Sequence, residues 1–79
     1  MKKSNIYFTI LNHVNSGVLK QPFNVSDVNN NCNGLLNKSP SFLSKHCVGN
    51  PGGYTEYFTK ERDLNGVIKR GYYRINSMN

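Results

Sequence analysis

The segment 39–58 constrains the fold most, because residues that start and stop helices divide it into a short helix, a turn and the start of a strand. Ser39 can cap the helix, and Pro40 suits the first helical position, where its missing N–H costs nothing. Gly49 can adopt the left-handed backbone conformation that closes a helix. We therefore predict a third helix over about residues 39–48.

A β-hairpin is predicted beyond this helix, because Asn65-Gly66 is a strong turn signal between two segments of alternating polarity. The alternation begins at Tyr54. With a two-residue loop, Phe58 would lie opposite Tyr73. This register would place three side chains on the core face: Phe58, Tyr73 and Ile75.

Apolar residues that recur at every fourth position near the start of the chain predict an amphipathic helix. It is expected to be capped near Ser4 or Asn5 and to end at Ser16-Gly17. The stripe comprises Ile6, Ile10, Val14 and Val18, widened by Tyr7 and Leu11. A short edge strand is expected over 20–25, where a proline stands near the start and apolar residues alternate with polar ones.

Ser26 is the predicted N-cap of a second helix, with Asp27 favourably placed in the first turn. Val28 and Cys32 would form the inner face, and the Asn-Gly dipeptide at 33–34 would end the helix. Two short helices joined by a turn that contains glycine are typical of a helix-turn-helix.

The charge balance favours an acidic partner. The 79 residues include ten lysines and arginines but only four acids, which gives a net charge of +6. Such a surplus suits a nucleic acid or an anionic membrane. We expect one domain over 1–79, ordered over about 5–76, that is too small for the large cleft of most enzymes. Without a membrane-spanning run or an export signal, the expected location is cytoplasmic, and no membrane association is expected.

Half of the positive charge falls within a segment of fifteen residues, from Lys60 to Arg74. On the predicted hairpin, the far end gathers Lys60, Arg62, Lys69 and Arg70. Lysines on an exposed strand also prevent unwanted pairing, so a solvated edge is the alternative interpretation. The position of the hairpin directly after a polar-faced short helix favours contact with phosphates.

This order of elements resembles the winged helix-turn-helix DNA-binding domain over roughly residues 5–76. Segment 42–58, Phe-Leu-Ser-Lys-His-Cys-Val-Gly-Asn-Pro-Gly-Gly-Tyr-Thr-Glu-Tyr-Phe, is similar to small winged-helix modules associated with restriction endonucleases. Segment 70–75, Arg-Gly-Tyr-Tyr-Arg-Ile, is similar to the last wing strand of many winged helices. The resemblance implies an α+β fold of three helices, a short edge strand and a C-terminal hairpin wing. The chain departs from restriction enzymes because no nuclease motif accompanies these segments.

The resemblance further implies that double-stranded DNA is the partner, with the third helix in the major groove and the wing on phosphates or in the minor groove. The implied contacts on and before the helix are Lys38, Ser39, Ser41, Ser44, Lys45 and His46. Those in the wing are Lys60, Arg62, Lys69 and Arg70. Such a protein would regulate transcription or serve as the reading module of a restriction-modification system, and would associate with the nucleoid. The alternative is a small basic interaction module or inhibitor, for example one encoded by a phage, that binds a nucleic-acid enzyme.

No catalytic, metal or cofactor site is predicted. His46 and Cys47 are adjacent, and neighbours on a helix point about 100° apart, which prevents a nucleophile–base pair. The cysteines and histidines also lack the spacing of zinc ligands, so Cys32 and Cys47 are expected to be buried thiols. We expect a monomer, with a homodimer through the first helix as the alternative.

Overall fold

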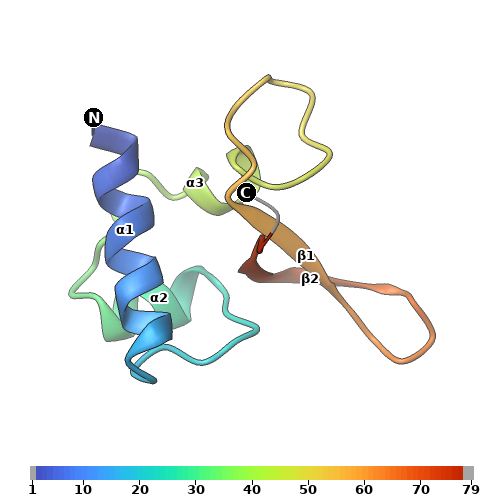
Figure 1. Cartoon of the computed structure of the whole chain (residues 1–79), viewed down its shortest axis with the longest axis horizontal. Coiled ribbons are helices and arrows are strands. Elements are labelled where there is room, and N and C mark those ends of the chain that lie inside the picture. Colours follow the sequence, from blue (N-terminus) through green and yellow to red (C-terminus); the bar gives the residue numbers. More distant parts are fainter. Residues whose placement is uncertain (1, 78–79) are drawn as a thin grey trace.

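The fold, given by a computed structural model, places three helices before a C-terminal hairpin (Figure 1). The structure describes residues 2–77, with side chains from residue 5 onwards. The elements are α1 (Lys2–Asn15), α2 (Val25–Asn31), α3 (Phe42–Lys45), β1 (Phe58–Arg62) and β2 (Ile68–Ile75). This α+β arrangement is consistent with a winged-helix-like topology. None of the helices described combines the length and apolarity needed to cross a membrane.

Helix α1 turns its predicted apolar stripe towards the core, but it begins at Lys2, so the predicted cap near Ser4 or Asn5 is wrong. Ile10 is fully buried and Tyr7 nearly so, while Ile6 and its neighbours on the stripe pack partly against the core. Val18 was predicted to extend the stripe, but this is wrong, because α1 ends at Asn15 and Val18 lies 52% exposed beyond it. The chain turns after the helix, and Leu19 is buried instead.

The predicted edge strand over 20–25 is reduced to one bridge. Phe23 donates its N–H to the carbonyl of Tyr73 at 2.9 Å and accepts the N–H of Tyr73 at 2.8 Å. Pairing stops there because Asn24 already caps α2. The single bridge still ties the segment between α1 and α2 to β2, close to the base of the hairpin.

The N-cap of α2 is Asn24, so the predicted cap at Ser26 is wrong. Asn24 Oδ1 accepts the N–H of Asp27 at 2.7 Å, and Asp27 Oδ2 accepts the N–H of Asn24 at 3.1 Å. This reciprocal pair needs a carboxylate three residues after the cap, which Asn24 has and Ser26 lacks. The inner-face residues Val28 and Cys32 are buried as predicted. The exit at 33–34 is also confirmed, since both residues have positive φ.

Helix α3 is a single turn of four residues, so the prediction of a helix over 39–48 is wrong at both ends. At the start, Ser41 rather than Ser39 is the N-cap, and no side chain caps the helix. The N–H of Phe42 bonds to the carbonyl of Ser39 at 3.1 Å, which closes a tight turn before the helix begins. Pro40 lies in that turn and not at the first helical position.

Pairing with β1 ends α3 early. Phe58 donates its N–H to the carbonyl of His46 at 3.0 Å, and Val48 donates to the carbonyl of Phe58 at 2.8 Å. These bonds form a parallel bridge between Cys47 and Phe58. The carbonyl of His46 and the N–H of Val48 are thereby paired with Phe58, so they are not available to continue the helix. Gly49 has the predicted left-handed conformation, with φ of 92°.

The hairpin forms, but its predicted register is wrong. Phe58 pairs with Ile75 rather than with Tyr73, and Lys60 pairs with Tyr73. The loop has three residues, 64–66, closed by the N–H of Asp63 to the carbonyl of Val67 and by a glycine with positive φ at 66. The alternating segment from Tyr54 is not strand before Phe58, because β2 ends at Ile75 and offers it no partner.

The core centres on Phe58, which is fully buried. Its ring lies 6.2 Å from that of Tyr7 in α1, 6.1 Å from Phe23 and 5.9 Å from Phe42 in α3, measured between centroids. Edge-to-face packing at these distances adds to the burial of the rings. Phe58 therefore fixes the base of the hairpin against both α1 and α3, and Tyr73 and Ile75 pack partly against the same core.

Candidate nucleic-acid interface

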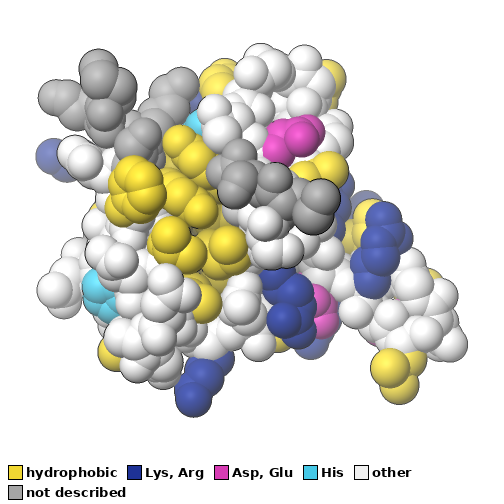
Figure 2. All heavy atoms as spheres, in the orientation of Figure 1, with side chains coloured by type: hydrophobic (Ala, Val, Ile, Leu, Met, Phe, Trp, Pro, Cys, Tyr) yellow, Lys and Arg dark blue, Asp and Glu magenta, His cyan; other side chains and the backbone are white. Residues whose placement is uncertain are grey.

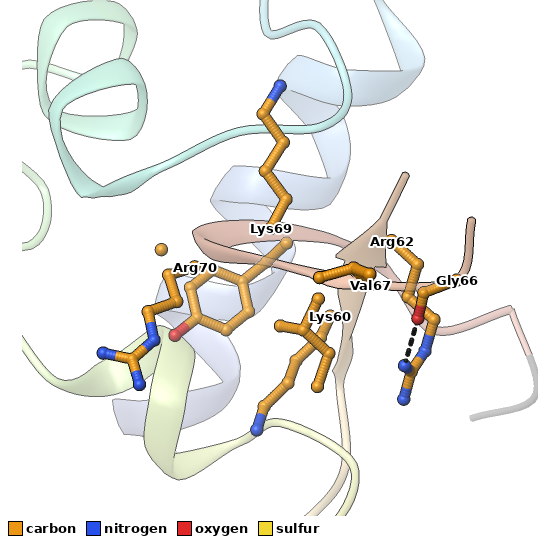
Figure 3. Close-up of a pocket in the computed structure, with 9 residues that line it drawn as sticks. Lys60, Arg62, Gly66, Val67, Lys69 and Arg70 are labelled. Atoms are coloured by element: carbon orange, nitrogen blue, oxygen red, sulfur yellow. Dashed lines mark hydrogen bonds between the residues drawn. The ribbon is translucent and has the colours of Figure 1, made fainter. Parts of the chain in front are cut away.

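The hairpin carries an open hollow of about 760 Å³ on which the predicted cations meet (Figure 3). Four of the side chains that line it are basic: Lys60, Arg62, Lys69 and Arg70. All four are exposed to solvent. The structure therefore brings together, from both strands, the whole wing cluster that the sequence predicted.

A bulge in β2 explains this grouping. Between the pairs Lys60–Tyr73 and Arg62–Ile68, four residues of β2 (69–72) stand opposite the single residue Glu61. Gly71 within the bulge has φ of 81°, a conformation that favours glycine. Bulges bend a strand and increase its twist, and so re-aim the side chains they carry. Lys69 and Arg70 lie within this bulge and border the same hollow as the cations of β1.

The two acidic side chains of the hairpin, Glu61 and Asp63, both bond to groups within the hairpin itself. Glu61 forms an ion pair with Arg74, the single ion pair found among the residues that the structure describes. Asp63 uses its Oδ1 within the loop, where it accepts the N–H of Asn65 at 2.8 Å and that of Val67 at 3.0 Å. The four cations of the hollow are therefore not neutralised by a paired carboxylate.

The cations differ in their direction and local contacts. In Figure 3, Lys60, Arg62 and Arg70 extend to one side of the hairpin, whereas Lys69 points the opposite way. Arg62 donates from Nη1 to the carbonyl of Gly66 at 2.8 Å. The Lys69 ammonium lies 4.7 Å from the centre of the Tyr72 ring, a cation–π contact. The charges of Lys60, Arg62 and Arg70 therefore face one side of the hairpin, and the charge of Lys69 faces the other.

The predicted contacts near α3 form a second group. A hollow of about 250 Å³ is lined by Lys38, Ser39, Ser41 and Lys45, together with Tyr54. The Lys45 ammonium lies 5.8 Å from the centre of the Tyr54 ring. Ser41 and Lys45 are exposed, as expected for groove-facing residues, whereas Ser39 is half-buried.

His46 was expected to face the groove with the residues of α3, and this is wrong. It is only 3% exposed, and its Nδ1–H donates to the carbonyl of Thr55 at 2.8 Å. Its ring lies 4.5 Å from that of Phe42 and 5.1 Å from that of Tyr57. The prediction assumed a longer helix with His46 on its outer face, whereas the early end of α3 turns this side chain into the aromatic core.

Lys60 connects α3 with the wing. A third hollow, of about 260 Å³, lies between Ser44 and segment 47–51 on one side and Lys60 and Tyr73 on the other. Lys60 and Tyr73 also line the large hollow of the hairpin. Ser44 of α3 therefore borders a surface that continues onto the basic wing, while the hollow around Lys45 shares no residue with the wing hollow.

Sequence reasoning missed the aromatic neighbours of the lysines. Tyr54 lies beside Lys45 because segment 50–57 folds back over α3, and no local signal indicates that path. Tyr72 lies beside Lys69 because both belong to the bulge of β2, which a regular hairpin would not contain. Tyrosines interleaved with cations suit a polyanion with exposed rings or bases.

Both cysteines, Cys32 and Cys47, are free thiols buried in the fold. Burial raises the pKa of the Cys32 and Cys47 thiols, although the nearby charge of Lys60 opposes the shift at Cys47. A thiol with a raised pKa is a poor nucleophile near neutral pH. Within the described part of the chain, no three side chains of histidine, cysteine, aspartate or glutamate are grouped to hold a metal ion.

Comparison of the chain with models of protein families, with curated proteins and with solved structures gives no match. The chemistry open to this surface therefore follows from its own geometry and charge. It offers several exposed cations around one hollow and hydroxyl groups on a neighbouring helical turn. Such a surface suits a partner that carries regularly spaced negative charges.

Proposed function

We propose that this protein binds double-stranded DNA as a winged-helix-type module in which the wing makes the main contact. The observation that carries the proposal is the group of four exposed cations, free of paired acids, around the hollow of the hairpin. The phosphates of duplex DNA are close and regularly spaced, so several basic side chains on one ribbon can bind them at once. Transcription regulation and the reading module of a restriction-modification system are both roles that such binding would serve.

In this proposal α3 plays a smaller part than the third helix of the predicted fold. A helix of four residues presents only a few side chains, of which Ser44 and Lys45 are exposed. Ser44 lies closest to the wing, because it borders the hollow that Lys60 shares with the hairpin. We assign Ser44 a phosphate or base-edge contact beside the wing, and Lys45 a backbone contact further along the duplex.

The proposal is tested by the salt dependence of binding to a fluorescent 24-base-pair duplex, followed by anisotropy. Each phosphate contact contributes about −0.9 to the slope of log affinity against log salt concentration, so four contacts predict a slope of about −3.6. Arg70→Gln should make the slope shallower by about 0.9. Lys20→Gln removes an equally exposed charge outside the three hollows and should leave the slope unchanged. A wild-type slope near zero would contradict duplex binding.

A protein partner is the second candidate, and the shortness of α3 favours it. A single helical turn offers little surface for reading bases, and small folds of this shape also bind proteins. This candidate predicts weak DNA binding that hardly responds to salt. It also predicts a tight complex with a nucleic-acid enzyme. The affinity of that complex should change by the same amount in Arg70→Gln and in Lys20→Gln.

A further inference from the structure

The free end of the hairpin is apolar although it faces solvent. Leu64 is fully exposed, and Val67 and Ile68 beside it are 61% and 40% exposed. Figure 2 shows apolar side chains at this end of the molecule, beyond the cations of the hairpin. Single exposed apolar residues are common, but tight loops usually carry polar ones, so a group of three at one loop points to a contact.

The loop that carries Leu64 is firmly held. The carboxylate of Asp63 accepts two backbone N–H groups, at 2.8 and 3.0 Å, and its backbone pairs with Val67 and Gly66 at 2.9 and 3.0 Å. Arg62 adds a bond to the carbonyl of Gly66 at 2.8 Å. Leu64 is thus presented on an ordered support, which lowers the conformational entropy lost when it enters a partner.

The surroundings of the loop indicate which partner it fits. Arg62 and Lys69 stand on neighbouring strands just behind the apolar end. Their charges would meet the two phosphate walls of a narrow groove while the apolar side chains reach its floor. The DNA minor groove has this form, and apolar side chains inserted there separate stacked base pairs and kink the duplex.

We propose that Leu64, supported by Val67, is a wedge that enters the minor groove and partly unstacks one base step. The proposal rests on the proposed function and adds a mechanism of sequence preference to it. Pyrimidine–purine steps such as TA unstack most easily, so a wedge favours them without any hydrogen bond to a base. Preference of this kind does not depend on a long recognition helix.

The test compares Leu64→Ser with Val18→Ser, which removes an apolar side chain that is 52% exposed and lies outside the hairpin. Both variants keep the charge of the chain, and their folding is checked by circular dichroism. Energy transfer between dyes at the ends of a 24-base-pair duplex with a central TA step reports bending. Fluorescence of 2-aminopurine at that step reports unstacking.

We expect the wild type and Val18→Ser to bend the duplex and raise the 2-aminopurine signal. Leu64→Ser should bind roughly 3- to 10-fold more weakly and leave the duplex straight, with the salt slope unchanged because no phosphate contact is lost. Equal bending by Leu64→Ser would overturn the wedge alone and leave duplex binding intact. Absence of salt-dependent binding by the wild type would overturn both proposals.

An apolar end with cations behind it could also insert into a membrane. Binding to lipid vesicles is therefore measured as a separate arm of the test. Vesicles of phosphatidylglycerol and phosphatidylcholine in equal parts are sedimented with each protein. If Leu64 acts as a wedge in DNA, any binding of the wild type to vesicles should be the same in Leu64→Ser. Vesicle binding that depends on Leu64, together with a duplex that stays straight, would overturn the wedge in favour of membrane insertion.

Discussion

The base and the outer part of the hairpin belong to the same two strands but are stabilised differently. At the base, Phe58 is enclosed by aromatic rings from three other segments, and its backbone also pairs with the residues after α3. Further out, residues 62–71 are all exposed and are held by backbone pairing and the bonds of Asp63. Three of the five hairpin cations, Arg62, Lys69 and Arg70, lie on this outer part, and Lys60 and Arg74 lie nearer the base.

Under the proposed function, this difference separates folding from binding. Substitutions at the base should unfold the domain whatever they do to charge, whereas substitutions in the outer part should alter binding and leave the fold intact. Figure 2 shows apolar side chains gathered over α1 and basic ones along the hairpin.

Phe58→Ala should have the largest effect on stability. Truncation of a buried phenylalanine costs about 3–5 kcal/mol, which is most of the stability of so small a domain. Phe8→Ala removes the same ring from a position that is 53% exposed and should cost less than about 1 kcal/mol. Urea unfolding followed by circular dichroism measures both. Similar losses in the two variants would show that Phe58 is not the centre of the core.

The triple variant Lys60→Gln, Arg62→Gln, Arg70→Gln tests the exposed cations of the hairpin. With three phosphate contacts removed, the slope of log affinity against log salt should become shallower by about 2.7. The urea midpoint should stay close to that of the wild type, because none of these side chains is in the core. A large loss of stability in this variant would mean that the two parts are not separable.

Asn24→Ala should weaken the domain moderately through α2. Loss of an N-cap costs about 1 kcal/mol, and here the reciprocal bond to Asp27 is lost as well. Ser26→Ala, two residues on, should leave the urea midpoint almost unchanged because Ser26 is exposed inside the helix. The reverse result would restore Ser26 as the cap.

The smallest effect concerns pH. Burial raises the pKa of Cys32 and Cys47 above the ordinary value of 9.0, and that of Tyr73 above 10.0. The folded protein therefore holds these protons more tightly than the unfolded chain does. This contribution is complete below about pH 9 and is lost as the pH rises through the raised folded pKa values. The melting temperature should fall above pH 9, and less steeply in Cys47→Ala.

The sequence predicted those features of the fold that depend on residues close to one another in the chain. The spacing of Ile10 and its partners predicted α1, the Asn-Gly turn predicted the hairpin, and the clustering of charge predicted the basic wing. The length of α3 was not predictable in this way, because the bridge between Cys47 and Phe58 ends it. The burial of His46 follows from the same bridge.

The register of the hairpin was missed for a related reason. A two-residue loop was the simplest continuation of Asn65-Gly66, and a regular ladder then places Phe58 opposite Tyr73. The observed ladder contains four residues of β2 opposite Glu61, and nothing in the alternation of the sequence marks this excess. The predicted grouping of the four wing cations is still observed, because charge clustering survives a change of register.

The bulge over 69–72 has a consequence for how this chain can vary. It uncouples the pairing of Arg62 with Ile68 from the pairing of Phe58 with Ile75. Insertions or deletions in the outer segment can therefore be absorbed without displacing the residues that anchor the strands. The outer segment can therefore change its length while Phe58 and the rest of the core keep their packing.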